Sequence, residues 1–441
     1  MIKSRGQECA FKGEITAFLA LTFMLILSIV AALIQSANLY ATKHNNRIRT
    51  QIALESTFAE YSSELLNQYE IFSRFGASLS VLQNRLDFYG VGDMTHEIEK
   101  VEYLTDHSGR PFYEQAIHYA KNWLGLDEVM LGTTYEFSAN EDIEHEERGV
   151  LESIQEFLEE EEKELPKDNN PIQSVQMLKN MNLLTLVAPE QEQFSNQTIS
   201  LSELPSHRRL NKGNYEASSK VGTLDKPFFI AYLAEHFSHY KNEKENTSLS
   251  YECEYLIGGK KSDRANLEVV CKRILQIRML ANYGYLLTDE GKKTEAEVMA
   301  AALCTLAGAP QLTALVKHAI LLVWAYGESI VDVRVLLKGK KSPFLKTKET
   351  WQLQLANLIT LGTEHEVSGE KDGGRGLGYQ DYLYGLLLLE KNETLSMRSL
   401  DLIESNLHIM ADQCMTKVKI KSQYTLWKGV NDEYTTSFAY Q

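Results

Sequence analysis

An uncharged apolar stretch near the N-terminus constrains this chain more than any other feature. No charged side chain occurs in residues 15–42, and residues 15–34 read ITAFLALTFMLILSIVAALI. About 20 apolar residues in a helix cross the ~30 Å hydrocarbon layer of a bilayer, and a helix pairs its own backbone groups there. The sequence therefore predicts a cytoplasmic tail at residues 1–14, a single transmembrane helix at 15–37 and the bulk of the chain beyond it.

The charges on either side of this helix indicate its orientation. Basic residues flank it on both sides: Lys3, Arg5 and Lys12 precede it, and Lys43, Arg47 and Arg49 follow it. The tail charges favour a cytoplasmic N-terminus, and a large domain is translocated largely regardless of its own charge. We expect a single-pass cell-membrane protein whose bulk is extracytoplasmic. An uncleaved signal-anchor is expected because the apolar run is longer than that of a signal peptide, with cleavage near residues 35–37 as the alternative.

The composition of the chain is that of a folded, helix-rich protein. Hydrophobic residues make up 44% and aromatic residues 10%, with 8 prolines in 441 residues. Such a chain can bury a substantial core. Of the 5 cysteines, Cys9 lies in the tail, and the others are scattered without metal-type spacing: Cys253, Cys271, Cys304 and Cys414. Buried free thiols are expected, with two disulfides as the alternative.

Most of the net charge lies in one short segment. Residues 136–168 contain 14 acidic and 3 basic residues, so they contribute −11 to the net charge of −15. Such a segment is typical of a solvated excursion from a fold. An acidic surface is a poor partner for nucleic acid, and no calcium-loop pattern occurs in it. No nucleic-acid partner is therefore predicted.

The apolar pattern divides the chain beyond the membrane into three regions. A juxtamembrane helix is predicted at residues 38–75, where no proline or glycine occurs and apolar residues recur at helical spacing. An N-terminal ectodomain region at residues 76–225 contains the acidic segment. A C-terminal helical body at residues 226–441 follows it.

Two parts of the C-terminal body depart from the helical pattern. Residues 249–256 are read as a strand. Residues 415–428 and 434–440 alternate in the manner of an antiparallel pair. The predicted fold class is mainly α (α+β), with one small antiparallel β element near the C-terminus.

Two carboxylates stand inside the most apolar helical stretch beyond the membrane. Glu328 and Asp332 lie one turn apart within residues 312–337, and their charges argue for a buried core helix and against a second membrane span. Buried carboxylates need a cationic or hydrogen-bonding partner. The candidate partners are three arginines: Arg273, Arg278 and Arg334. A structural polar network is expected here, in preference to acid–base catalysis.

Short motifs that would bind nucleotides are incomplete. The glycine- and lysine-rich loops at residues 258–262 and 339–342 lack the first glycine of a phosphate loop, and residues 373–378 lack the third glycine of a dinucleotide loop. The basic stretch at residues 334–348 is read as a solvated loop, with binding of an anionic wall polymer as the alternative. No catalytic, cofactor-binding or metal-ligating residue and no cofactor is assigned.

The opening of the chain resembles a known family. KGEITAFLALTFMLILSIVAALIQSANLYATKHNN, continuing into ALESTFAEYSSELLNQYEIF, resembles the N-terminus of TadE/TadG-like pseudopilins of tight-adherence (Flp) pilus systems. Further segments are similar to a family of uncharacterised membrane proteins of Gram-positive bacteria associated with such loci: LTDHSGRPFYEQAIHYAK, LLTLVAPEQEQFSNQTISLSELPS, YECEYLIGGKKSDRANLEVVCKRILQIR, VWAYGESIVDVRVLLKGKKSPFLKT and GLGYQDYLYGLLLL. The resemblance implies partners among Tad-like assembly proteins or copies of the chain itself, beside the lipid bilayer.

The chain departs from the pseudopilin pattern at the processing site. Prepilin-type sites have a glutamate at the fifth position after the glycine, whereas here Glu14 follows Gly13 directly and Phe18 occupies the fifth position. We therefore expect an uncleaved accessory protein. The leading hypothesis is a non-enzymatic, membrane-anchored extracytoplasmic accessory protein of a Tad/Flp-like pilus or secretion assembly. A membrane-anchored envelope hydrolase and a wall-binding adhesin are the alternatives.

Overall fold

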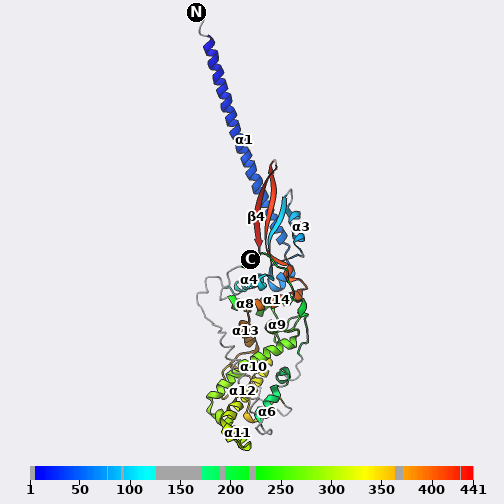
Figure 1. Cartoon of the computed structure of the whole chain (residues 1–441), viewed down its shortest axis with the longest axis vertical. Helices are drawn as coiled ribbons and strands as arrows, with labels where there is room; N and C mark the ends of the chain where they lie inside the picture. The colour runs from blue at the N-terminus through cyan, green and yellow to red at the C-terminus, as the bar shows by residue number, and fades with distance from the viewer. Residues whose placement is uncertain are drawn as a thin grey trace.

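The computed structural model describes residues 5–76, 78–90, 94–125, 170–179, 181–188, 194–217, 225–362, 371–427 and 429–440. The described part is elongated, with a long helix at one end, a small sheet beside its base and a helical body at the other end (Figure 1). The acidic segment at residues 136–168 lies outside the described residues.

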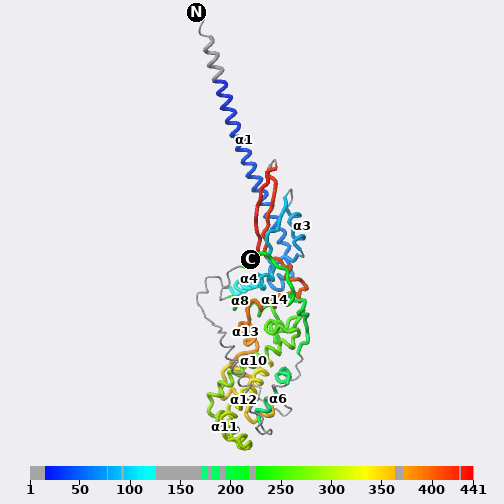
Figure 2. Tube along the Cα trace, in the orientation of Figure 1, coloured from blue at the N-terminus to red at the C-terminus, as the bar shows by residue number. Residues whose placement is uncertain are grey.

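Helix α1, Arg5–Phe58, runs without interruption for 54 residues from the apolar stretch into the folded part (Figure 2). At a rise of 1.5 Å per residue, a helix of this size is about 80 Å long. From Ile15 to Ala41 every side chain except the half-buried Thr22 is exposed. Among the described residues, this helix alone is long and apolar enough to cross a membrane. The expected apolar helix that continues into a juxtamembrane helix is thus confirmed.

The last quarter of α1 buries one face against the rest of the fold. Asn46, Thr50, Ala53 and Thr57 are buried, and their spacing of three and four residues places them on one side of the helix. The three polar members of this set are small, and the Thr50 and Thr57 hydroxyls donate to main-chain carbonyls one turn earlier. This face can therefore pack closely without leaving those hydroxyls unpaired.

Helix α1 ends at Phe58, earlier than the juxtamembrane helix predicted for residues 38–75. The carbonyls of Thr57 and Phe58 accept hydrogen bonds from the side chains of Arg74 and Tyr440. A new helix then begins because the Ser62 side chain accepts from the backbone of the first turn of α2, Ser63–Tyr69. Capping side chains from distant parts of the chain thus divide a sequence that has no proline or glycine to mark the break.

The sheet is organised around one long strand. Strand β3, Cys414–Trp427, pairs antiparallel with β1, Arg74–Phe75, with β2, Met94–Tyr103, and with β4, Val430–Ala439. The predicted antiparallel element near the C-terminus is confirmed, and β2 adds a strand from more than 300 residues earlier. The sheet therefore joins both ends of the chain.

The two faces of the sheet follow the alternation of its strands. On the outward side, Lys419 pairs with Glu99 at 3.1 Å and Lys421 pairs with Glu433 at 2.6 Å. The inward side forms a core with α1 and with α3, Leu79–Gly90. Its buried members are Leu54, Phe58, Leu82, Leu86, Val101, Tyr103, Met415, Val418 and Ile420.

The remaining helices form the body below the sheet in Figure 1. The α-helices not yet named are α4 Asp106–Trp123, α6 Pro171–Lys179, α7 Leu183–Val187, α8 Asp225–His236, α9 Glu252–Gly258, α10 Asp263–Thr288, α11 Glu290–Leu306, α12 Thr313–Leu337, α13 Tyr379–Leu389 and α14 Asn392–Leu407. Short 3-10 helices are η2 Leu201–Glu203, η3 Pro310–Leu312, η4 Leu355–Thr360 and η5 Ala411–Gln413. The stretch 249–256, predicted to be a strand, instead leads into α9.

Helix α12 is the central element of this body. Every residue from Ala319 to Leu337 is buried, and α6, α7, α10, α11 and η4 all pack against it. A helix that is apolar around its whole circumference suits such a position. The prediction of a buried core helix, as opposed to a second membrane span, is confirmed.

One core extends across the boundary expected near residue 225. It includes Leu65 and Phe112 from the N-terminal region as well as Phe229 and Leu400 from the C-terminal body. The four cysteines beyond α1 are free and buried, as predicted in preference to disulfides: Cys253, Cys271, Cys304 and Cys414.

Candidate functional site

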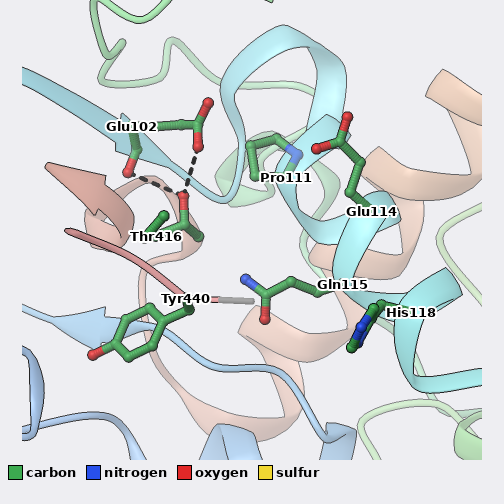
Figure 3. Close-up of a pocket in the computed structure, with 8 residues that line it drawn as sticks. Glu102, Pro111, Glu114, Gln115, His118, Thr416 and Tyr440 are labelled. Atoms are coloured by element: carbon green, nitrogen blue, oxygen red, sulfur yellow. Dashed lines mark hydrogen bonds between the residues drawn. The ribbon is translucent and has the colours of Figure 1, made fainter. Parts of the chain in front are cut away.

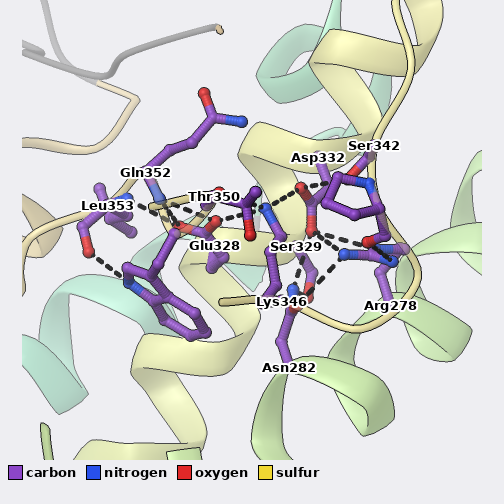
Figure 4. Close-up of polar contacts among 12 residues, drawn as sticks. Arg278, Asn282, Glu328, Ser329, Asp332, Ser342, Lys346, Thr350, Gln352 and Leu353 are labelled. Atoms are coloured by element: carbon purple, nitrogen blue, oxygen red, sulfur yellow. Dashed lines mark hydrogen bonds and ion pairs between the residues drawn. The ribbon is translucent and has the colours of Figure 1, made fainter. Parts of the chain in front are cut away.

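The charged groups of α12 form a closed network with neighbouring elements (Figure 4). Arg278 of α10 donates from Nε and Nη2 to Oδ2 of Asp332, at 3.0 and 2.9 Å. Asn282, one turn further along α10, donates to the same oxygen at 2.9 Å. Of the three arginines proposed as partners, Arg278 is thus the one that reaches a carboxylate of α12, that of Asp332.

Lys346 completes the network, and sequence reasoning did not single it out. Its Nζ lies 2.7 Å from Oε1 of Glu328 and 2.6 Å from Oδ1 of Asp332, and all three side chains are fully buried. One arginine and one lysine therefore face two carboxyl groups in the buried cluster. The lysine follows α12 in a loop, where its sequence position gave no signal of burial.

The two other candidate arginines lie outside the network. Arg273 pairs with Glu390 at the end of α13, and Arg334 donates to the carbonyl of Leu186. Because Arg334 and Lys346 are both buried, the basic stretch at residues 334–348 is not one continuous solvated surface.

The surroundings shift the pKa values of Glu328 and Asp332 in opposite directions. Burial, reinforced by the charge of Asp332, raises the pKa of Glu328 to about 7 against the opposing effect of Lys346. Burial also acts to raise the pKa of Asp332, but the charges of Arg278 and Lys346 outweigh it and lower that pKa. Asp332 is therefore the fixed negative centre of the cluster.

Glu328 also connects α12 to the following loop. Its carboxylate accepts from the backbone N–H groups of Gln352 and Leu353, the latter at 2.7 Å. The carbonyl of Leu353 in turn accepts from the indole nitrogens of Trp324 and Trp351. One carboxylate thus fixes the position of a loop on the central helix.

The same use of carboxylates recurs throughout the body. Glu252 and Glu254 of α9 accept from the backbone N–H groups of Ser238 and Tyr240. Further helix or helix-start carboxylates accept from loop N–H groups in the same way: Asp106 from Gly213, Asp263 from Ser250 and Tyr251, Asp401 from Ser206, and Asp412 from Asn211. These acidic residues are occupied in holding loops, which supports a structural role for them.

The glycine-rich loops also have structural explanations. Gly259 takes φ +58° at the C-cap of α9, and a Cβ on Gly376 would lie 2.5 Å from the carbonyl of Ser342. Ser342 and Leu377 form an isolated bridge at that point. The first glycine ends a helix and the second allows two loops to approach closely.

A groove between α4 and the sheet brings together two carboxyl groups and an imidazole (Figure 3). Glu102, Glu114 and His118 line this groove of about 340 Å³ with Thr416 and Tyr440. Burial is the main cause that raises the pKa of Glu102, and the charge of Glu114 adds to it. A carboxyl group with a raised pKa is suited to general acid catalysis. Sequence reasoning missed these residues because 12 positions separate the two glutamates.

A larger cleft of about 770 Å³ lies at the start of α4. It is bordered by a turn in which His107, Ser108 and Gly109 all take positive φ angles, of 51°, 61° and 79°. The Asp106 carboxylate holds this turn by accepting from the backbone of Tyr103 and Gly213. Left-handed conformations cost energy at non-glycine residues, so this turn is maintained by its surroundings.

Within the ranges that the structure describes, no group of three or more His, Cys, Asp or Glu side chains is placed to hold a metal ion. The fold and the site define a mainly helical protein with one long N-terminal helix suited to membrane anchoring, a small antiparallel sheet and a buried polar network.

Residues 161–426 match a family described as "Family of unknown function (DUF5702)", and the chain belongs to this family. The matched residues run from α6 to nearly the end of β3, whereas α1 to α4, β1, β2 and β4 lie outside them. Comparison with curated proteins and with solved structures gives no match.

Proposed function

We propose that this protein is a membrane-anchored, extracytoplasmic accessory protein of a Tad/Flp-like pilus or secretion assembly, and that its role is structural. The observation that carries the proposal is the continuity of α1. The same helix supplies the apolar segment and, further along, the buried face that packs on the sheet. The position of the ectodomain is therefore coupled to the membrane helix without a flexible linker.

The coupling is reinforced where the helix leaves its apolar segment. Lys43 forms an ion pair with Asp432 at 3.3 Å, and the guanidinium of Arg47 lies 5.3 Å from the ring centroid of Tyr434. A tethered enzyme that must search for substrate gains from a mobile connection, whereas an assembly component must hold a fixed geometry. The rigid connection favours the second role.

The basic residues of the tail favour a cytoplasmic N-terminus. The tail carries Lys3, Arg5 and Lys12. Because a large domain is translocated largely regardless of its own charge, these residues favour a tail inside and a body outside.

The partners of this proposal are lipid and other membrane helices. Large apolar side chains along α1, among them Phe18, Leu25 and Leu33, are more than half exposed. Such a surface is stable only in lipid or against other apolar helices. Copies of this chain or Tad-like assembly proteins would present helices of that kind.

Photo-crosslinking in the native host tests the proposal. A photoreactive amino acid at Leu25 should yield adducts with an assembly component or a second copy, and the same group at Ser437, on an exposed strand of the ectodomain, serves as the control. Deletion of the gene should abolish the assembled structure, while a chain with the Glu102→Gln substitution should restore it. Normal assembly in the deletion strain would refute the proposal.

The groove at Glu102 favours a second candidate function, that of a membrane-anchored envelope hydrolase. Glu102 with its raised pKa would act as the acid and Glu114 as the second carboxylate. In this case, the Glu102→Gln chain would fold normally but fail to complement the deletion. The same pair of strains thus separates the two functions.

A further inference from the structure

The hairpin of β3 and β4 lies along α1 in a fixed register. Asp432 contacts Lys43, and Tyr434, two residues further along β4, contacts Arg47, four residues further along α1. Two strand residues advance about 6.8 Å and four helix residues about 6 Å. The strand and the helix therefore advance together, and the register can be extended towards the turn of the hairpin.

Extending this register by two strand residues places Val430 level with Leu39. A groove of about 540 Å³ between the hairpin and the helix agrees with that placement. Leu426 lines one side of it. The other side is formed by Ala31, Ile34, Gln35, Asn38, Leu39 and Thr42 of α1. The red hairpin beside the blue helix shows the same arrangement in Figures 1 and 2.

The edge of the membrane falls at the same level of the helix. Residues 15–34 span about 30 Å as a helix, which matches the hydrocarbon layer, and the headgroups add about 5–8 Å on each side. The headgroup layer therefore covers α1 from about Ile34 to Leu39. Val430, level with Leu39, therefore lies at this layer when α1 spans the bilayer.

The composition of the turn suits such an environment. By sequence the turn reads Leu426-Trp427-Lys428-Gly429-Val430, and the side chain of Val430 is 58% exposed. Aromatic residues are enriched at membrane interfaces, and basic residues near them attract anionic headgroups. In water, the exposed side chain of Val430 would leave apolar surface uncovered.

We propose that the turn of the β3–β4 hairpin is a second membrane contact, inserted among the phospholipid headgroups beside α1. This inference rests on the proposed anchoring of α1 in the bilayer. Two contacts on one rigid unit, a helix through the bilayer and a hairpin on its surface, set the tilt and the height of the ectodomain above the membrane.

Nitroxide labels in the full chain test the proposal in vesicles of phosphatidylethanolamine and phosphatidylglycerol. Three variants, each also carrying Cys9→Ser, place the label at Leu25, Val430 or Ser437. The four other cysteines are buried and free, so they should react little. Ser437 is exposed on the same strand as Val430, about 24 Å further from the turn at ~3.4 Å per residue.

The accessibility of each label to water is measured from its collisions with a water-soluble nickel chelate. The label at Leu25 should be inaccessible to nickel, that at Ser437 fully accessible, and that at Val430 several-fold less accessible than Ser437. Equal accessibility at Val430 and Ser437, with Leu25 protected and circular dichroism unchanged, would overturn the hairpin contact and leave the anchor standing. Nickel access at Leu25 would instead overturn the anchoring of α1 itself, and with it this inference.

Discussion

Arg278 and Asp332 form a fully buried, two-pronged ion pair between α10 and α12, in which both Nε and Nη2 donate to a single carboxylate oxygen. The remaining oxygen of Asp332 accepts from Ser342 and Lys346. The pair thus joins the central helix to both a neighbouring helix and the loop that follows it.

Replacing Asp332 with asparagine should strongly destabilise the protein. The substitution leaves the Arg278 guanidinium buried without its counter-ion, a loss that typically costs about 3–5 kcal/mol. Chemical denaturation of the full chain in detergent measures the change. Glu297→Gln, which removes an ion pair at the surface with Lys317, is the control and should change the stability little. An equal effect of the two substitutions would contradict the assigned role of the network.

The stability contributed by Glu254 should fall as the pH rises. Burial raises the pKa of this carboxyl group to about 7, above the value of about 4.5 expected when unfolded. The folded protein therefore holds a proton that the unfolded chain releases, and this contribution is present below about pH 4.5 and is lost as the pH passes 7.

Comparison with Glu254→Gln isolates this effect. Glutamine cannot ionise and resembles the protonated carboxyl group, so the two chains should be about equally stable at pH 5. The unsubstituted chain should become the less stable of the two, by roughly 2 kcal/mol, towards pH 7.5. Burial lowers the pKa of His239 to about 4, which acts in the opposite sense. That contribution is shared by both chains and cancels in the difference. An unsubstituted chain that gains stability relative to the variant as the pH rises would show that the direction of the Glu254 shift is wrong.

Replacement of two helical glycines by alanine should change the stability of the protein in opposite directions. A Cβ on Gly327 of α12 would lie 2.4 Å from a methyl carbon of Leu358 and 2.7 Å from one of Leu353, whereas a Cβ on Gly284 of α10 would meet nothing within 4 Å. Gly327→Ala should cost about 1–3 kcal/mol through overpacking. Gly284→Ala should stabilise by roughly 0.5–1 kcal/mol because alanine is the better helix former. Thermal unfolding of the two variants side by side checks both signs.

Protease added to intact protoplasts should remove the ectodomain. The expected product is a small membrane fragment that contains the tail and the apolar part of α1, since residues beyond about 45 are exposed outside in the proposed orientation. Immunodetection with tags at each terminus follows both ends. Protection of the large domain until the membrane is permeabilised would reverse the orientation.

The sequence predicted the parts of the fold that depend on local pattern. The uncharged run identified α1, the apolar circumference identified α12, and strand alternation identified β3 and β4. The prediction of a strand at residues 249–256 was wrong. Two glutamates of α9 are buried there because they accept hydrogen bonds from backbone N–H groups of a loop that lies 14 residues earlier. The local sequence pattern around residues 249–256 does not reveal these contacts.

The buried polar network shows the same limit of sequence-based prediction for a candidate functional site. Glu328 and Asp332 were recognisable because charge inside an apolar helix needs compensation. The choice of Arg278 over Arg273 depends on which face of α10 meets α12. Lys346 lies on a loop among several exposed lysines, and only the folded path of that loop places it against both carboxylates.

The central position of β3 has a consequence for biogenesis. The strand begins at Cys414, so β2 has no strand partner, and the buried face of α1 has only α3 as cover, until nearly the whole chain has been made. In the proposed orientation, β2 and part of the helix base would remain available to extracytoplasmic chaperones or proteases during export. A chain that stops before Cys414 would leave them exposed permanently. Completion of the last hairpin would then be the step that distinguishes a finished subunit from an aborted one.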